Sequence, residues 1–170
     1  TSDHGELHGH HGLWGKGLAA YDDSQRVPLI IAAPGQLPAQ GSTQALTSLI
    51  DLPHTFLRMA GLDIPQGIQG TDLSPVLKGE AETVQEAVVV ESRPTKGTLY
   101  QHTLVTDRYK LAVYRDWDLG ELYDMQEDPD QYRNLWTDPA HRDTREKLLL
   151  QLLQTNMRRE GAVHARINFG

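Results

Sequence analysis

The chain has 170 residues, of which 38% are hydrophobic and 23% charged, a mix that is ordinary for a globular protein. Its formal net charge of −7, without a basic cluster, argues against nucleic acid as the main partner. The absence of cysteine excludes disulfides and thiolate metal sites, and no apolar run approaches the roughly 20 residues that a membrane span needs. We therefore expect no membrane partner, and the compartment stays open between cytoplasm and periplasm.

The first seventeen residues form a Gly- and His-rich stretch, which we interpret as an active-site loop. Five glycines in it allow the backbone to take φ > 0. Metal-ligating and anion-binding side chains are more concentrated here than anywhere else in the chain: Asp3, His4, His8, His10, His11 and Lys16.

Residues 27–79 alternate apolar runs with turn residues, which is typical of an α/β arrangement. The continuous apolar run 27–33 has the length of a strand and predicts one buried on both faces of a sheet. Helical periodicity predicts a helix over 51–60, with Asp51 as its cap and Gly61 as its stop. A shorter helix is expected over 71–78, with Asp72 near its cap and Gly79 ending it.

The composition changes after residue 80, and the second half favours an α+β arrangement. Strands are predicted over 87–91, 98–105, 109–115 and 121–124, with a hairpin turn at 106–108. Short links between successive strands favour an antiparallel sheet. Asp138 and Pro139 open a last helix, whose apolar positions repeat with helical period and are expected to cover one face of this sheet. We predict two domains, residues 1–85 and residues 86–170.

The chemistry of the opening loop suggests a metal site next to an anion site. At a strand end that turns through Gly5, the Asp3 carboxylate and the His4 imidazole can face one divalent cation. Lys16 has a compact charge that suits a phosphate or sulfate oxygen. His11 can donate a hydrogen bond or a proton to the same anion.

Simpler interpretations of these residues remain open. An Asp-His pair is more often a turn or a cap than a metal site, and a lysine beside glycine is usually only solvated. The histidines could give adventitious metal affinity or be the remnant of an expression tag, although Leu7, Leu13 and Trp14 interrupt the run.

An ordered series of motifs resembles the second half of a sulfatase. The series begins with Ser2-Asp-His-Gly-Glu6, His11-Gly-Leu-Trp-Gly-Lys16 and Arg26-Val-Pro-Leu-Ile-Ile, followed by Ala33-Pro-Gly35. It continues with Ser48-Leu-Ile-Asp51-Leu, Gly70-Thr-Asp-Leu-Ser-Pro75-Val-Leu-Lys-Gly79, Arg108-Tyr-Lys-Leu and Gly120-Glu-Leu-Tyr-Asp124. Each motif alone is weak to moderate evidence, but together they cover most of residues 1–136 in the family's order.

The resemblance implies a partial alkaline-phosphatase-like sheet with helices in residues 1–85, followed by the small antiparallel subdomain. It implies one divalent cation, Ca²⁺ first and Mn²⁺ as the alternative, beside a formylglycine nucleophile. Asp3 and His4 fall on the family's late pair of metal ligands, and Lys16 falls on the lysine that contacts the sulfate. His11 lies in the family's His-Gly pair, where its catalytic role is less certain.

The departures from the family bear on activity. The nucleophile motif Cys/Ser-x-Pro-x-Arg and two further acidic ligands have no counterpart in these residues, so the chain is expected to be a C-terminal fragment that does not hydrolyse sulfate esters alone. The whole enzyme would act on a small sulfate ester. There are two alternatives. One is a phosphonate or phosphate ester hydrolase of the same superfamily, and the other is a non-catalytic interaction module. An unpaired sheet edge at 27–33 would favour a homo-oligomer.

Overall fold

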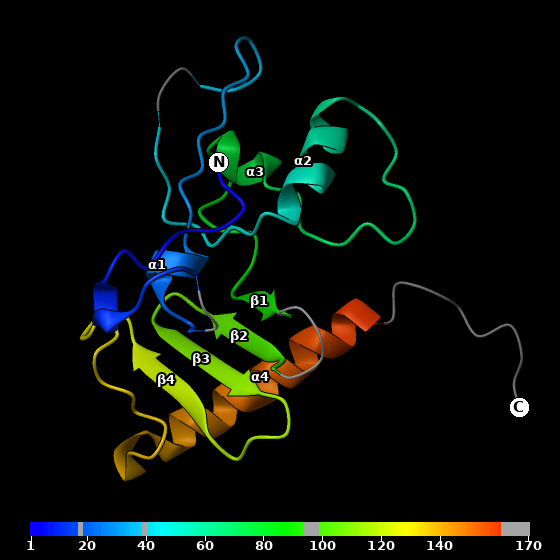
Figure 1. The fold of residues 1–170 in the computed structure, drawn as a ribbon. Helices are drawn as coiled ribbons and strands as arrows, with labels where there is room; N and C mark the ends of the chain where they lie inside the picture. Colours follow the sequence, from blue (N-terminus) through cyan, green and yellow to red (C-terminus); the bar gives the residue numbers. More distant parts are fainter. Residues whose placement is uncertain (17–18, 39–40, 94–98, 161–170) are drawn as a thin grey trace, which may run out of the picture. The chain divides into compact units, whose positions relative to one another are not determined.

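The computed structural model describes residues 1–16, 19–38, 41–93 and 99–160, except the side chain of residue 160. Contacts divide the chain into two compact units (Figure 1). Unit 1 comprises residues 1–31 and 89–149, and unit 2 comprises residues 32–88 together with the chain from residue 150. The expected boundary at residue 85 stays a prediction. Among the described helices, none combines the length and apolar character needed to cross a membrane.

Unit 1 is built on a four-stranded sheet of order β1-β2-β3-β4, formed by β1 (Val88–Ser92), β2 (Gln101–Val105), β3 (Tyr109–Tyr114) and β4 (Gly120–Asp124). The pairs β2–β3 and β3–β4 are antiparallel. This confirms the small antiparallel sheet, although the start of the strand expected at 98–105 lies partly outside the described residues. The β2–β3 hairpin closes at Thr106, whose amide donates to the Tyr109 carbonyl at 2.9 Å.

The two faces of this sheet differ in chemistry. Leu104, Leu111 and Leu122 stand opposite one another across β2, β3 and β4, and all are fully buried. Because side chains alternate along a strand, the other face carries the neighbouring positions, and these include Gln101, Thr103 and Lys110. The first face is the apolar core, and the second is polar yet also buried.

The last helix begins where the sequence predicted it. The Asp138 carboxylate accepts from the Ala140 amide at 2.9 Å and caps a short 3-10 turn, η2 (Pro139–His141), which leads into α4 (Arg142–Glu160). The part of α4 up to Leu149 belongs to unit 1, and Leu148 is buried there. Figure 1 shows this part of the helix along one face of the sheet, so the predicted cover is confirmed for it.

Unit 2 contains α2 (Asp51–Met59) and α3 (Ser74–Leu77), close to the predicted helices. Asp51 is not the cap of α2, because Ile50 holds that position. The buried Asp51 carboxylate instead accepts hydrogen bonds from the Ser48 amide, the Thr71 amide and the Gln85 side chain, at 2.7–2.8 Å. It thus fastens two loops to the helix. Asp72 lies near the cap of α3 as expected: it directly precedes the capping residue Leu73 and accepts from the Ser74 amide at 2.9 Å.

The strand predicted at 27–33 is wrong for this chain, since these residues pair with no strand among those the structure describes. Side chains from Arg26 to Pro34 alternate between exposed and half-buried, and Ile30 is 88% exposed. One side of the segment therefore lies against protein and the other faces solvent. The apolar run was interpreted as buried on both faces, but its second face has no cover here.

Candidate active-site loop

The opening loop is held at both ends by backbone hydrogen bonds. The Leu7 amide donates to the Gly15 carbonyl at 3.0 Å, and the Leu7 side chain is buried, so the loop closes on an apolar anchor. The Gly5 amide donates to the Ser24 carbonyl at 2.9 Å. At Gly5 the two segments approach so closely that a Cβ would stand 1.9 Å from the Asp23 carbonyl oxygen. Only glycine fits there.

The structure brings together three of the predicted site residues. His4 Nε2 lies 3.6 Å from Asp3 Oδ2 and 2.6 Å from Lys16 Nζ, which reaches it from twelve positions along the chain. Asp3 and Lys16 are exposed, and His4 is half-buried. First its own backbone amide and then the neighbouring His4 lower the pKa of Asp3, so that its carboxylate is ionised at neutral pH. A carboxylate, an imidazole and an ammonium thus meet at one point.

The hydrogen bonds of His4 prepare it as a ligand. Its Nδ1 lies 2.8 Å from the Gly5 carbonyl oxygen, which can only accept, so Nδ1 carries the proton. Nε2 is then left with its lone pair directed toward Asp3 and Lys16. A backbone carbonyl that fixes the tautomer is the usual support of a metal-bound histidine. The Asp3–His4 pair therefore fits a divalent cation, with two of the ligands it needs.

The other loop histidines have different surroundings. His8 is exposed. His11 packs within a group of rings: it stacks on Tyr21 at 3.7 Å between centroids and lies 4.7 Å from Tyr132. Its predicted role as a proton donor stays a prediction. His10, to which the sequence assigned no chemistry, has its Nδ1 2.7 Å from Asp23 Oδ2.

Asp23 belongs to α1 (Asp22–Gln25), a single helical turn that sequence reasoning missed. Its four residues lack an apolar periodicity, so no pattern indicated a helix. Burial raises the pKa of Asp23, but the hydrogen bond from His10, a backbone hydrogen bond and the nearby imidazoles together outweigh burial, so the pKa lies below its usual value. The signal that could have found it is the acidic pair Asp22-Asp23 directly before the run that begins at Arg26.

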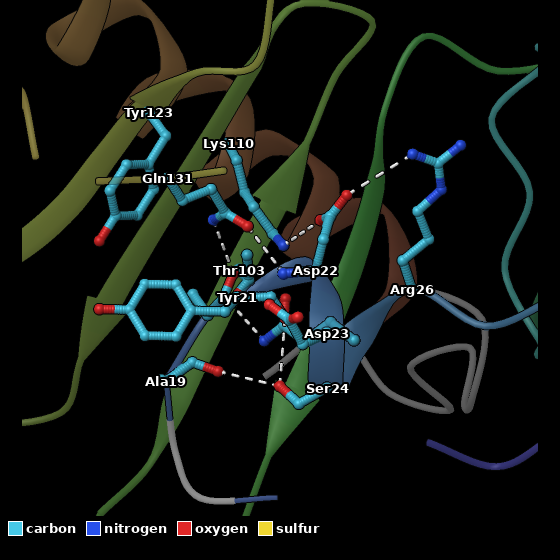
Figure 2. A network of polar contacts seen from close by, with 12 residues as sticks. Ala19, Tyr21, Asp22, Asp23, Ser24, Arg26, Thr103, Lys110, Tyr123 and Gln131 are labelled. Carbon is cyan, nitrogen blue, oxygen red and sulfur yellow. Dashed lines mark hydrogen bonds and ion pairs between the residues drawn. The ribbon is translucent and has the colours of Figure 1, made fainter. Parts of the chain in front are cut away.

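A buried polar network ties α1 to the polar face of the sheet (Figure 2). Lys110, on β3, is 1% exposed, and its Nζ lies 2.6 Å from Asp22 Oδ1. Gln131 accepts from the Asp22 amide at 2.7 Å and donates to the Ala20 carbonyl at 3.1 Å. Gln25 donates to Thr103 on β2 at 3.2 Å. The Ser24 carbonyl of α1 also accepts the hydrogen bond from the Gly5 amide. The sheet therefore fixes the position of the opening loop through α1.

Asp3, His4 and Lys16 thus lie together on a loop anchored to the antiparallel sheet, as the resemblance to sulfatases led us to expect. The comparisons agree. Residues 9–158 match the family described as N-sulphoglucosamine sulphohydrolase, C-terminal. The chain therefore belongs to the sulfatase family, in its C-terminal region.

Individual relatives support this assignment. An N-acetylglucosamine-6-O-sulfatase of Bacteroides thetaiotaomicron is 35% identical over 161 residues, which cover 91% of this chain and 28% of that protein. A second relative is a protein whose structure was solved in complex with its substrate D-glucosamine-2-N,6-O-disulfate. Its sequence is 30% identical to this one, and the two structures superpose with a TM-score of 0.84 over 94% of this chain and 34% of that one.

A phosphonate monoester hydrolase from Silicibacter pomeroyi is 33% identical, with a TM-score of 0.80 over 92% of this chain and 34% of that one. The fold is thus that of the C-terminal part of an alkaline-phosphatase-like enzyme. The chain spans less than a third of the curated relative's length. Sulfatases as a family use a metal ion and a formylglycine residue.

Proposed function

We propose that this chain supplies those active-site residues of a divalent-metal-dependent sulfuric ester hydrolase that come from the C-terminal region of the enzyme. The observation that supports it is the meeting of Asp3, His4 and Lys16 at one point, with the His4 tautomer set by Gly5. The nucleophile, a formylglycine, and the remaining acidic ligands would come from the rest of such an enzyme.

In this proposal Asp3 and His4 bind the cation through Oδ2 and Nε2. The bound cation would polarise the sulfate oxygens and lower the barrier to attack on sulfur. Ca²⁺ prefers six to eight oxygen ligands. The His4 imidazole is a nitrogen ligand, which is more typical of transition metals, so Mn²⁺ is also a candidate. We keep Ca²⁺ as the expected ion and Mn²⁺ as its alternative.

Lys16 would contact the sulfate. In the structure its ammonium donates to the His4 Nε2 lone pair. If His4 Nε2 held a cation, Lys16 would lose this acceptor and its ammonium would be repelled, because like charges a few ångströms apart repel strongly outside bulk water. The side chain is exposed and long enough to turn to an anion instead. There it would neutralise the charge that develops on the transferred group.

The test is Lys16→Ala in a sulfatase polypeptide that contains this chain, assayed with an aryl sulfate. Loss of a contact to the developing oxyanion is expected to lower kcat/KM by about 10²-fold or more. Lys147→Ala removes the same charge from an exposed position on α4 and serves as the control. Equal kcat/KM for wild type and Lys16→Ala contradicts the assigned role.

The substrate class is proposed from the relatives. A small sulfated sugar, with D-glucosamine-2-N,6-O-disulfate as the first compound to try, follows from the structure solved with that substrate. A phosphonate ester hydrolase is the second candidate, because the similarity to the phosphonate monoester hydrolase covers as much of the chain. Turnover of the disulfate against a phenylphosphonate ester separates the two.

A non-catalytic module is the remaining alternative. Calorimetric titration of the polypeptide with Ca²⁺ and with Mn²⁺, in wild type and in His4→Gln, tests it. Binding that His4→Gln weakens supports a catalytic metal site. Equal binding in both proteins, or none, favours the module.

A further inference from the structure

The turn at His10–Gly12 brings two neighbouring imidazoles to the same side of the chain. The ring centroids of His10 and His11 lie 4.2 Å apart. Neighbours on a strand point to opposite faces, and neighbours on a helix diverge. Here His11 adopts φ 53°, ψ 19°, a left-handed conformation that non-glycine residues adopt rarely. Such a backbone persists only where its surroundings hold it, and it is often found at functional sites.

Surrounding contacts hold the turn in this conformation. The Gly9 amide donates to the Leu13 carbonyl at 2.8 Å, and the Leu13 amide donates to the His10 carbonyl at 3.0 Å. The His11 ring lies parallel to the Tyr21 ring, with 6° between their planes. Both imidazoles are thus fixed before any ligand arrives, which lowers the entropic cost of binding one.

Asp23 completes the group from α1. Its carboxylate lies 2.7 Å from His10 Nδ1, and one ligand atom from each of His10, His11 and Asp23 lies within 4.8 Å of the others. The side chains of His10 and Asp23 are 26% and 30% exposed, so water and ions can reach them. His11 Nε2 is enclosed and has no hydrogen-bond partner in the described part of the chain. A buried polar atom without a partner is unfavourable, and a metal ion would satisfy it.

We propose that His10, His11 and Asp23 form a second metal site, for a transition metal such as Zn²⁺, made of residues different from those of the Asp3–His4 pair. Two imidazoles and one carboxylate are the ligands that Zn²⁺ prefers, and Ca²⁺ does not. Bonds of about 2.0–2.1 Å place tetrahedral ligand atoms about 3.3 Å apart, so the group needs only small side-chain rotations. Three protein ligands leave a fourth position for water. This site goes beyond the proposed sulfatase chemistry and does not depend on it.

The geometry predicts which residues matter. For Zn²⁺ to bind, the proton between His10 Nδ1 and Asp23 Oδ2 has to move to Nε2 of the same ring or to water, so that both atoms become ligands and the 2.7 Å contact widens. Asp23→Asn keeps the shape and an oxygen that accepts from His10, but loses the charge that binds the ion. His8→Gln is the matched control, since His8 lies in the same loop and is exposed.

The experiment is titration of the 170-residue chain with Zn²⁺ alone, in a His4→Gln background that removes the other candidate site. One Zn²⁺ per chain is expected. His10→Gln and Asp23→Asn should each raise Kd at least about tenfold, as loss of a direct ligand requires, whereas His8→Gln should not. Co²⁺ in place of Zn²⁺ should give the visible absorption of a tetrahedral ion, and it should be lost in the same two variants.

Far-UV circular dichroism shows that each variant is folded; if His10→Gln fails this check, Asp23→Asn carries the test. No Zn²⁺ binding in the His4→Gln background overturns the proposal. So does a folded Asp23→Asn or His10→Gln variant whose Kd equals that of the His8→Gln control. The readout is metal affinity, so failure of the sulfatase assay would not affect it.

Discussion

Removing the lysine of the buried Lys110–Asp22 ion pair should cost measurable stability, and Lys110→Met tests this. Methionine keeps most of the aliphatic stem, so the variant removes mainly the charge. Removing one partner of a buried pair costs about 3–5 kcal/mol. The Asp22 side chain is 30% exposed and has Arg26 at 3.7 Å, so water and a second cation partly compensate it. We therefore expect a loss of about 2–3 kcal/mol, which lies below that range or at its lower limit.

Lys110→Ala separates charge from packing. It removes about three buried methylene groups at about 0.8 kcal/mol each in addition to the charge, which gives about 4–5 kcal/mol in total. Urea titration followed by circular dichroism measures both values, with Lys147→Met as an exposed control expected within about 0.5 kcal/mol of wild type.

A double-mutant cycle with Asp22→Asn isolates the pair. If the ion pair stabilises the fold, Lys110→Met should cost less in the Asp22→Asn background than in wild type, because no carboxylate is left without its partner. Lys110→Met within about 0.5 kcal/mol of wild type, or two single effects that simply add, would refute the reasoning.

Three further predictions concern other parts of the chain. Gly5→Ala should lower the free energy of unfolding by about 1–3 kcal/mol, because its Cβ would stand 1.9 Å from the Asp23 carbonyl oxygen; an unchanged melting temperature contradicts this. The Arg108 hydrogen bond holds the pKa of Asp124 below its usual value, so the stability it adds is present above about pH 3.9 and is lost as pH falls through the lower folded pKa. Asp124→Asn should therefore flatten the acid side of the melting curve against pH, and parallel curves would argue against it. The solvent-facing side of segment 27–33 should pair with a second copy, for which light scattering of a monomer at all concentrations would be the counter-evidence.

Sequence reasoning found the elements whose signals are local. The four strands of the sheet have β-rich runs between turn residues, and Asp138-Pro139 opens the last helix as cap and first-turn residue. These features depend on residues within a few positions of each other. The segment 27–33 failed because its signal, a continuous apolar run, reports burial and not the presence of a neighbouring strand.

The candidate site was predicted in part for the same reason. Asp3, His4 and Lys16 follow one another along a single glycine-rich loop, so their convergence could be inferred from the chain. The pairing of His10 with Asp23 could not, because it depends on the left-handed turn at His11 and on a helix without a sequence pattern. Lys110 and Asp22 are 88 positions apart, and only the fold brings them together.

The single turn α1 connects these parts in a way that side-chain patterns do not reveal. Successive helical side chains point about 100° apart, so Asp22 and Asp23 face different partners, while the backbone carbonyl of the turn remains free for a third. Asp22 binds Lys110 of the sheet, Asp23 binds His10, and the Ser24 carbonyl accepts from Gly5. Any change to α1 therefore acts on the loop as well as on the sheet. It follows that a loss of activity in an α1 variant has to be compared with its stability before a catalytic role is assigned, whereas variants of the exposed Lys16 are free of that ambiguity.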